Sequence, residues 1–216
     1  MTQVMQTPVK PGASAPEFTV PAVHDERMIS LADYRGNAPV LLGLFPGLYC
    51  PFCRRAIAQM AVTSEKLKPL GVECVAVVGT ELDNARLYFS FRPTRLTLGA
   101  DPQLTTHKSY GVPRPEPTPE LFEMVGKTLI NPTGELPEPL PVQIAAATLN
   151  EKDGFQFTET DRREGASTFT QTKGHFLIDR TGVVRWTKVE CEKEGLPGLG
   201  KFPTHEELMA AARLVT

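Results

Sequence analysis

The chain has 216 residues, of which 41% are hydrophobic and 22% are charged, and this composition indicates a soluble globular protein with one large domain or one domain carrying an insertion. The formal net charge of -2 gives no electrostatic reason to expect a nucleic acid or an anionic membrane as a partner. No apolar run approaches the roughly 18 residues of a membrane-spanning helix, and the amino-terminal residues lack an apolar signal core, so we expect a cytoplasmic location.

The amino-terminal half of the chain predicts alternating strands and helices. Residues 40–45 (VLLGLF) and 72–79 (VECVAVVG) are short apolar runs, which are typical of strands buried on both faces. Between them, from Pro51 onward, apolar residues recur with helical spacing, while Arg54 and Arg55 point away from the apolar face. This strand–helix–strand order with short connections is typical of a parallel α/β unit.

Other elements expected in this half have weaker patterns. Residues 1–16 are polar and proline-rich and indicate an extended arm, and residues 17–23 form a short strand candidate. The sequence Thr80-x-x-Asp83 resembles a capped helix start and predicts a helix to about Arg92. A short strand and a short helix are expected to follow it.

The composition changes in the second half of the chain. Eight of the 20 prolines lie between Val112 and Val142, and regular structure is hard to place there. The exception is a helix over Pro119–Gly126, which Thr118 would cap. We therefore expect residues 113–170 to form an insertion in the main domain.

The α/β pattern returns near the carboxy-terminal end. Two apolar strands within residues 175–190 flank a turn at Asp179–Gly182, which predicts a hairpin. The sequence Thr204-x-x-Glu207 has the pattern of a capping box, and the apolar residues after it repeat with the spacing of one helical face. A final helix is therefore expected.

A Cys-x-x-Cys pair, Cys50 and Cys53, stands where the first buried strand ends and the first long helix begins. Pro51 suits the first helical turn, which places Cys50 at or near the N-cap and Cys53 one turn inside. Free backbone amides and the positive helix end lower the pKa of a thiol there from about 8.5 to roughly 3.5–7.5. Arg54 would add positive charge, so we predict a redox-active dithiol.

Two other roles for the pair are less favoured. A structural zinc site normally needs four ligands, but Cys74 and Cys191 are isolated and no pair of histidines follows, so we expect no metal and no organic cofactor. A purely structural disulfide is unneeded in a chain of this size. We expect Cys74 to be a core residue and Cys191 to be a surface thiol or a second resolving thiol across a dimer.

Three stretches of the chain resemble one known family. They are GASAPEFTVPAV…ISLADYRGNAPVLLGLFP (12–46, with a gap), GADPQLTTHKSYGV (99–112) and KGHFLIDRTGVVRW (173–186). In this order they resemble the alkyl hydroperoxide reductase/thiol-specific antioxidant (peroxiredoxin-like) branch of the thioredoxin superfamily. The resemblance implies one thioredoxin-like α/β domain over residues 1–216, with a central mixed sheet flanked by helices, and with the insertion at 113–170.

The resemblance also assigns roles to individual residues. The family has P-x-x-x-T-x-x-C at its active site; Pro46 matches the proline, Cys50 stands in the threonine position, and Cys53 matches the peroxide-attacking cysteine. Lys173 occupies the place of an arginine that polarises the peroxide, and an Arg-to-Lys change loses a fork of donors. Tyr49 flanks the thiols, either shielding them or packing beside them. The peroxidase role thus has Cys53 attack and Cys50 resolve.

Two further functions remain open. In dithiol/disulfide exchange, Cys50 attacks a substrate disulfide and Cys53 resolves the mixed disulfide. The sequence near Lys173 lacks the proline that faces the dithiol in disulfide-exchange thioredoxins. A non-catalytic redox-sensing interaction protein, whose surface is switched by the dithiol, is the second alternative. For the enzyme, the resemblance implies a thioredoxin- or glutathione-type electron donor and a homodimer.

Overall fold

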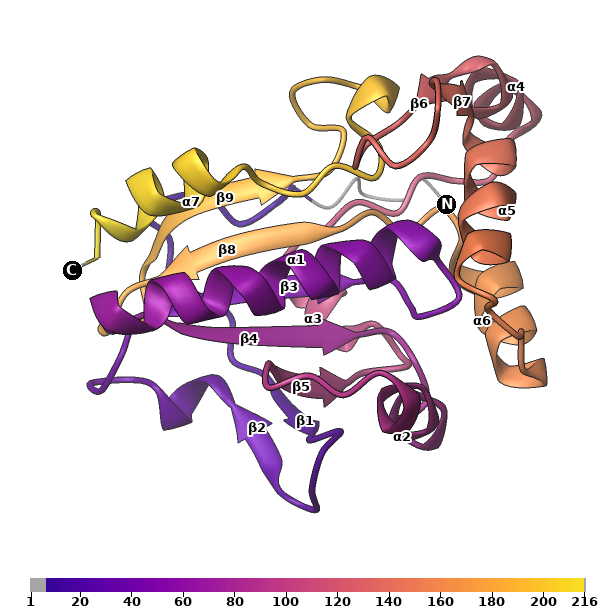
Figure 1. Ribbon diagram of the computed structural model, residues 1–216. Helices are drawn as coiled ribbons and strands as arrows, with labels where there is room; N and C mark the ends of the chain where they lie inside the picture. Colours follow the sequence, from indigo (N-terminus) through magenta and orange to yellow (C-terminus); the bar gives the residue numbers. More distant parts are fainter. Residues whose placement is uncertain (1–6, 216) are drawn as a thin grey trace, which may run out of the picture.

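The protein is built around a five-stranded mixed sheet (Figure 1), and the computed structural model describes residues 7–215. The strand order is β5-β4-β3-β8-β9. β3, β4 and β5 are parallel, β8 is antiparallel to β3, and β9 is antiparallel to β8. The strands span Val40–Phe45 (β3), Glu73–Val78 (β4), Thr97–Ala100 (β5), Gly174–Ile178 (β8) and Val184–Val189 (β9). The predicted central mixed sheet is confirmed.

Both faces of the sheet are covered. Three helices pack on one face: α1 (Pro51–Leu67), α2 (Leu82–Phe91) and α7 (His205–Ala212). The other face is covered by β1 (Thr19–Pro21), β2 (Met28–Ser30) and the residues that follow α3 (Thr105–Ser109). Successive side chains of a strand point to opposite faces, so in β3 Leu41 packs under the helices while Leu42 packs on the far side.

Residues 113–170 contain more regular structure than their prolines indicate. The elements are α4 (Pro119–Lys127), β6 (Leu129–Ile130), β7 (Leu140–Pro141), α5 (Val142–Lys152) and α6 (Glu159–Thr168). Thr118 caps α4 through its side chain, as predicted. Helices α5 and α6 are absent from the prediction, although Thr158 and Asp161 form a capping box at the start of α6. Figure 1 shows α5 and α6 beside the amino-terminal end of α1, where the β3–α1 loop lies.

Two capping predictions had different outcomes. The box formed by Thr204 and Glu207 is present at the start of α7. At the start of α2 the prediction was wrong, because Glu81 is the N-cap and makes no side-chain capping bond. The Thr80 hydroxyl instead accepts a hydrogen bond of 3.0 Å from the Leu48 amide. A contact 32 residues away along the chain thus replaced the local one.

The amino-terminal segment contacts both edges of the sheet. The Gly12 amide donates to the Val184 carbonyl at the start of β9, over 2.8 Å. The Val23 amide donates to the Leu98 carbonyl of β5, over 2.9 Å. Residues 1–6 of the predicted arm lie outside the described residues. None of the helices in residues 7–215 combines the length and apolar character needed to cross a membrane.

Candidate active site

The two cysteines of the pair occupy the start of α1, as the sequence predicts. Cys50 is the N-cap residue with extended backbone angles, and Pro51 occupies the first helical turn. The Cys53 amide donates to the Cys50 carbonyl over 3.1 Å, so one helical turn joins the two residues. Cys53 is only 1% exposed, whereas Cys50 is partly exposed. The two residues therefore differ in how far they are exposed to solvent.

The pKa values of the two thiols are shifted in opposite directions. A hydrogen bond from the Cys53 thiol, helped by the Lys173 ammonium, lowers the pKa of Cys50 from 9.0 to about 7 despite burial. Burial raises the pKa of Cys53 well above 9.0, and the Cys50 thiolate adds to the rise. When the pair loses its first proton, near neutral pH, the negative charge lies on Cys50 and the remaining proton stays on Cys53.

Lys173 lies beside this pair because of the sheet topology. Leu44 near the end of β3 pairs with Gly174 at the start of β8, so the residue before β8 lies beside the β3–α1 loop. The Lys173 side chain is 2% exposed and forms an ion pair of 2.7 Å with Glu190. Burial alone would lower the pKa of Lys173, but Glu190 and the two cysteines outweigh it and raise the pKa. Lys173 thus stays an ammonium ion, and it is not a solvated loop lysine.

Three contacts fix the loop that leads into the dithiol. A Cβ on Gly79 would lie 2.4 Å from the Pro46 carbonyl oxygen, so only glycine fits where β4 ends against this loop. The Leu48 amide is held by Thr80, as described above. The Tyr49 hydroxyl lies 3.0 Å from the Thr168 hydroxyl in α6, and burial raises the pKa of Tyr49. The loop is therefore held from β4 and from α6.

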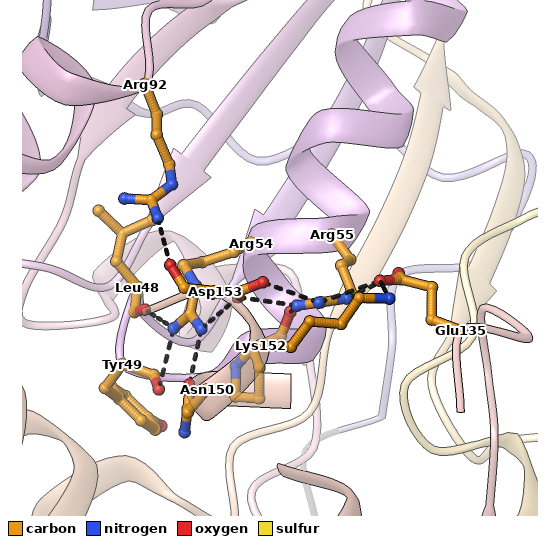
Figure 2. A network of polar contacts seen from close by, with 10 residues as sticks. Leu48, Tyr49, Arg54, Arg55, Arg92, Glu135, Asn150, Lys152 and Asp153 are labelled. Atoms are coloured by element: carbon orange, nitrogen blue, oxygen red, sulfur yellow. Dashed lines mark hydrogen bonds and ion pairs between the residues drawn. The ribbon is translucent and has the colours of Figure 1, made fainter. Parts of the chain in front are cut away.

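Arg54 does not point into solvent, contrary to the prediction from helical spacing. It is 5% exposed, and its guanidinium donates to the Leu48 carbonyl at 2.8 Å, to Asn150 at 2.6 Å and to Asp153 at 2.8 Å. Its guanidinium carbon also lies 3.9 Å from the centre of the Phe155 ring. Figure 2 shows Arg54 and Arg55 pointing together toward the carboxylate of Asp153. Both charges are thus used in binding residues 135–153.

Residues 129–153, which we call the cover, pack against the dithiol. Ile130, Leu136, Ala145 and Leu149 of the cover are buried in one apolar cluster with Phe52, the residue next to Cys53. The Cys50 side chain packs against this cluster. Phe52 therefore packs under the cover, and the sulfur of Cys50 has apolar neighbours on the cover side.

The other two cysteines have raised pKa values, unlike Cys50. Cys74 lies in the core under the helices, as predicted, and burial raises its pKa to about 12. Cys191 has a left-handed backbone (φ 63°), is partly exposed, and burial with the nearby Glu190 raises its pKa to about 12. Within residues 7–215, no three His, Cys, Asp or Glu side chains gather as ligands for a metal ion.

Three site residues were missed from the sequence. Glu190 is opposite Lys173 across the β8–β9 hairpin, but a register shift between Leu177 and Ile178 means that the predicted turn at 179–182 does not by itself give this pairing. Thr168 is the last residue of α6 and Asp153 directly follows α5, and neither helix was predicted in this proline-rich region. The sequence gives no sign that these two residues lie near the dithiol, since each is about 100 residues or more away from its partner along the chain.

The chain is similar to known thiol-dependent proteins. Residues 11–187 match the model of the AhpC/TSA family. A chloroplastic peroxiredoxin Q of Oryza sativa subsp. japonica is 28% identical over 105 residues, which are 49% of this chain and 48% of the relative. An equally similar relative comes from Oryza sativa subsp. indica. The matched region thus spans about half the length of these curated relatives.

Two solved structures share the fold over almost the whole chain. The peroxidoxin BcpB of Mycobacterium tuberculosis has a TM-score of 0.58 at 14% identity, and the alignment covers 96% of this chain and 98% of that one. The reduced 2-Cys peroxiredoxin of Plasmodium vivax has a TM-score of 0.58 at 16% identity, with coverages of 95% and 81%. These similarities confirm the thioredoxin-like fold.

Proposed function

The chain belongs to the AhpC/TSA family, since the family model matches residues 11–187, and from this premise we propose that it is an antioxidant enzyme that reduces peroxides through Cys50 and Cys53. The observation that carries the proposal is the lowered pKa of Cys50, close to 7, beside a buried partner thiol one helical turn away. Such a pair supplies both a nucleophile and a resolving group at neutral pH.

The proposed cycle uses both sulfurs. The Cys50 thiolate attacks the terminal oxygen of a hydroperoxide, the O–O bond breaks, and the leaving alkoxide or hydroxide takes up a proton. Cys50 is oxidised to a sulfenic acid, and the peroxide is reduced to an alcohol or water. The Cys53 sulfur then attacks the Cys50 sulfur, water leaves, and a disulfide forms. An external dithiol or two thiols supply the two electrons and two protons that restore the pair.

Cys50 is assigned here as the attacking sulfur, although the family spacing assigns that role to Cys53. With a pKa of about 7, roughly three quarters of Cys50 is thiolate at a pH half a unit higher. Cys53 is protonated at that pH and almost fully buried. The ionised sulfur of the partly exposed cysteine is the better nucleophile, and the buried thiol is placed to resolve it.

Lys173 is proposed to stabilise negative charge at the site. Its ammonium acts on both thiols and offsets part of their burial. Glu190 holds this ammonium by its side chain and accepts from the Lys173 amide at 3.1 Å, so the cation is fixed in position. Pro46, Tyr49 and Pro51 are proposed as the residues that shape the β3–α1 loop and the helix start.

The test compares wild type with Cys50→Ser and Cys53→Ser during reaction with hydrogen peroxide. We expect fast thiol loss in wild type, almost none in Cys50→Ser, and a sulfenic acid trapped by dimedone on Cys50 in Cys53→Ser. A dimedone adduct on Cys53 in Cys50→Ser would reverse the assignment of the sulfurs. Reaction no faster than that of a free cysteine in all three proteins would refute the peroxidase proposal.

Dithiol/disulfide exchange is the second candidate, and one observation favours it. A partly exposed cysteine of low pKa followed by a buried cysteine of raised pKa is also the arrangement that exchange requires. Reduction of insulin by the dithiol would support it, and failure to reduce insulin would count against it. A redox sensor, the third candidate, predicts a redox-dependent change in protease cleavage within 113–170 without turnover of either substrate.

Further assignments complete the proposal. We propose a thioredoxin- or glutathione-type electron donor, because the cycle ends in a disulfide that needs two electrons. A homodimer and a cytoplasmic location are also proposed, the latter because a reactive dithiol with few other cysteines suits a reducing compartment. We regard residues 113–170 as an insertion within a single domain, because they contribute no strand to the five-stranded sheet.

A further inference from the structure

The cover reaches the dithiol from a distant part of the sequence. It contains β6, β7 and α5, and its apolar residues form one cluster with Phe52, against which Cys50 packs. This contact involves the cysteine that is partly exposed, while Cys53 is almost fully buried in the core under the helices. The position of the cover therefore decides how much of Cys50 an incoming molecule can reach.

A group of five polar residues, which we call the clamp, holds the cover against α1. The clamp consists of Arg54, Arg55, Glu135, Asn150 and Asp153. The two arginines directly follow Cys53, and the three acceptors belong to the cover (Figure 2). The clamp thus joins the cover to the same turn of helix that carries the dithiol.

Asp153 is the residue on which the clamp converges. One carboxylate oxygen accepts from Arg54 at 2.8 Å and from Arg55 at 2.9 Å, and the other accepts from Arg55 at 2.9 Å. The Asp153 carbonyl also accepts from Arg92, at the end of α2, over 2.9 Å. Burial alone would raise the pKa of Asp153, but the two guanidinium groups lower it, so the carboxylate stays charged. Loss of the Asp153 carboxylate would leave the almost fully buried Arg54 guanidinium without its only ion-pair partner among the described residues.

A small cavity lies beside Lys173, and neither Cys50 nor Cys53 is among the residues that line it. A cavity of about 80 Å³ is lined by Lys173, Glu190 and Cys191, among others. A water molecule takes about 30 Å³ of liquid volume, so this space holds two or three small molecules. The apolar cluster of the cover lies against Cys50 instead, and a peptide strand that carries a disulfide is far larger than hydrogen peroxide, which is close to water in size.

We propose that Asp153 is a specificity-determining positioning residue, which closes the cover over Cys50 and so restricts the dithiol to small oxidants and small thiol reductants. The proposal rests on the proposed function for the identity of the oxidant, a low-molecular-weight hydroperoxide. It selects a glutathione-type reductant over a protein reductant, because a small thiol needs no movement of the cover. Asp153 acts through the cover and touches neither sulfur.

The test measures the access of Cys50 to thiol reagents of two sizes. Reduced protein is alkylated with iodoacetamide or with a maleimide carrying a long polyethylene glycol chain, and labelling of Cys50 is followed by peptide mapping. The ratio of the two rates, normalised to a free cysteine, cancels any change in the thiolate fraction. For Asp153→Ala we expect the bulky-to-small ratio to rise by about tenfold, since removing one partner of a buried charge pair favours the open state.

Two controls separate this effect from a general loss of structure. Asp153→Glu keeps the carboxylate and should restore at least part of the wild-type ratio. Glu123→Ala removes an exposed carboxylate that pairs with Lys127 on α4, away from the clamp, and should leave the ratio unchanged. If Asp153→Ala does not fold, the double variant with Glu135→Ala and Asn150→Ala weakens the clamp from its other acceptors. A folded clamp variant with the wild-type ratio would overturn the proposal.

The same variants distinguish a failure of the cover proposal from a failure of the proposed peroxidase function. If the dithiol does not reduce peroxides, the alkylation ratio still reports on the cover, because it needs no turnover. If it does reduce them, the rate with thioredoxin as donor should rise in Asp153→Ala, while the rate with glutathione or with hydrogen peroxide stays within about twofold of wild type. A wild-type protein that is reduced as fast by thioredoxin as by small dithiols would overturn the assigned reductant class.

Discussion

Replacing Lys173 by methionine should raise the pKa of Cys50. Methionine has similar length but no charge, so the change removes the ammonium that acts on the thiolate. Glu190 would lose its partner at 2.7 Å while staying buried, and its carboxylate would disfavour the thiolate further. The double variant with Glu190→Gln removes both charges, so no unpaired carboxylate is left beside the thiolate.

The magnitude follows from the shift at Cys50. Its pKa is lowered from 9.0 to about 7, which corresponds to about 3 kcal/mol in favour of the thiolate. The Cys53 hydrogen bond is the largest favourable cause and Lys173 is the next. We therefore expect Lys173→Met to return part of the shift and raise the pKa of Cys50 by about one unit. At pH 7 the thiolate fraction would fall from about one half to about one tenth.

The assay is the ultraviolet absorbance of the thiolate as a function of pH, together with the peroxide rate over the same range. The other thiols do not interfere, because burial raises the pKa of Cys74 and Cys191 to about 12 and raises that of Cys53 as well. A depressed pKa favours ionisation at neutral pH, so the peroxide rate of the variant should fall about fivefold at pH 7 and approach the wild-type rate at alkaline pH.

An unchanged titration midpoint in a folded Lys173→Met protein would refute the reasoning. It would mean that the Cys53 hydrogen bond alone sets the pKa of Cys50. A rate loss that persists at alkaline pH would instead show that Lys173 acts on the peroxide and not on the thiolate. The double variant should show a smaller rise in the pKa of Cys50, since Glu190 itself raises that pKa. It should also lose less stability, since no buried carboxylate is left unpaired.

Three further changes test other parts of the structure. Gly79→Ala would bring a Cβ to 2.4 Å from the Pro46 carbonyl oxygen, and we expect a loss of about 1–3 kcal/mol in urea unfolding together with a slower peroxide reaction. Burial alone would raise the pKa of Asp179, but hydrogen bonds in the hairpin turn lower it to about 2. Asp179→Asn should therefore cost about 1–2 kcal/mol at neutral pH after allowance for screening, and the difference from wild type should vanish as the pH falls from about 4 to 2. Thr158→Ala removes the capping box with Asp161 and should cost about 1 kcal/mol, whereas Thr158→Ser should be nearly neutral in the same urea measurement.

The sequence predicts those parts of the fold whose signals are local. The apolar run of residues 40–45 and Pro51 fix the strand-to-helix junction that carries Cys50. The turn at residues 179–182 fixes the hairpin. In each case the pattern that defines the element lies within the element, so no distant contact is needed to recognise it.

The failures all involve contacts made across long stretches of chain. Helical spacing puts Arg54 on the side away from the apolar face of α1, but residues 150–155 cover that side and bury the guanidinium. Thr80 has a suitable cap position for α2, but the loop before Cys50 takes its hydroxyl. The clamp at Asp153 has the same origin, since its charges become neighbours only after the cover has folded onto α1.

The contacts of residues 12–23 have a consequence for folding. This stretch is synthesised before the strands that it contacts, and one end of it pairs with β5 and the other with residues 182–184 at the start of β9. Its outer end therefore cannot bind until almost the whole chain has left the ribosome, and closing such a long loop makes this contact a late and slow one. Until then the free edges of the sheet present unpaired amide and carbonyl groups to neighbouring chains. A chain that lacks residues 12–23 should form the five-stranded sheet and then aggregate through its uncovered edges.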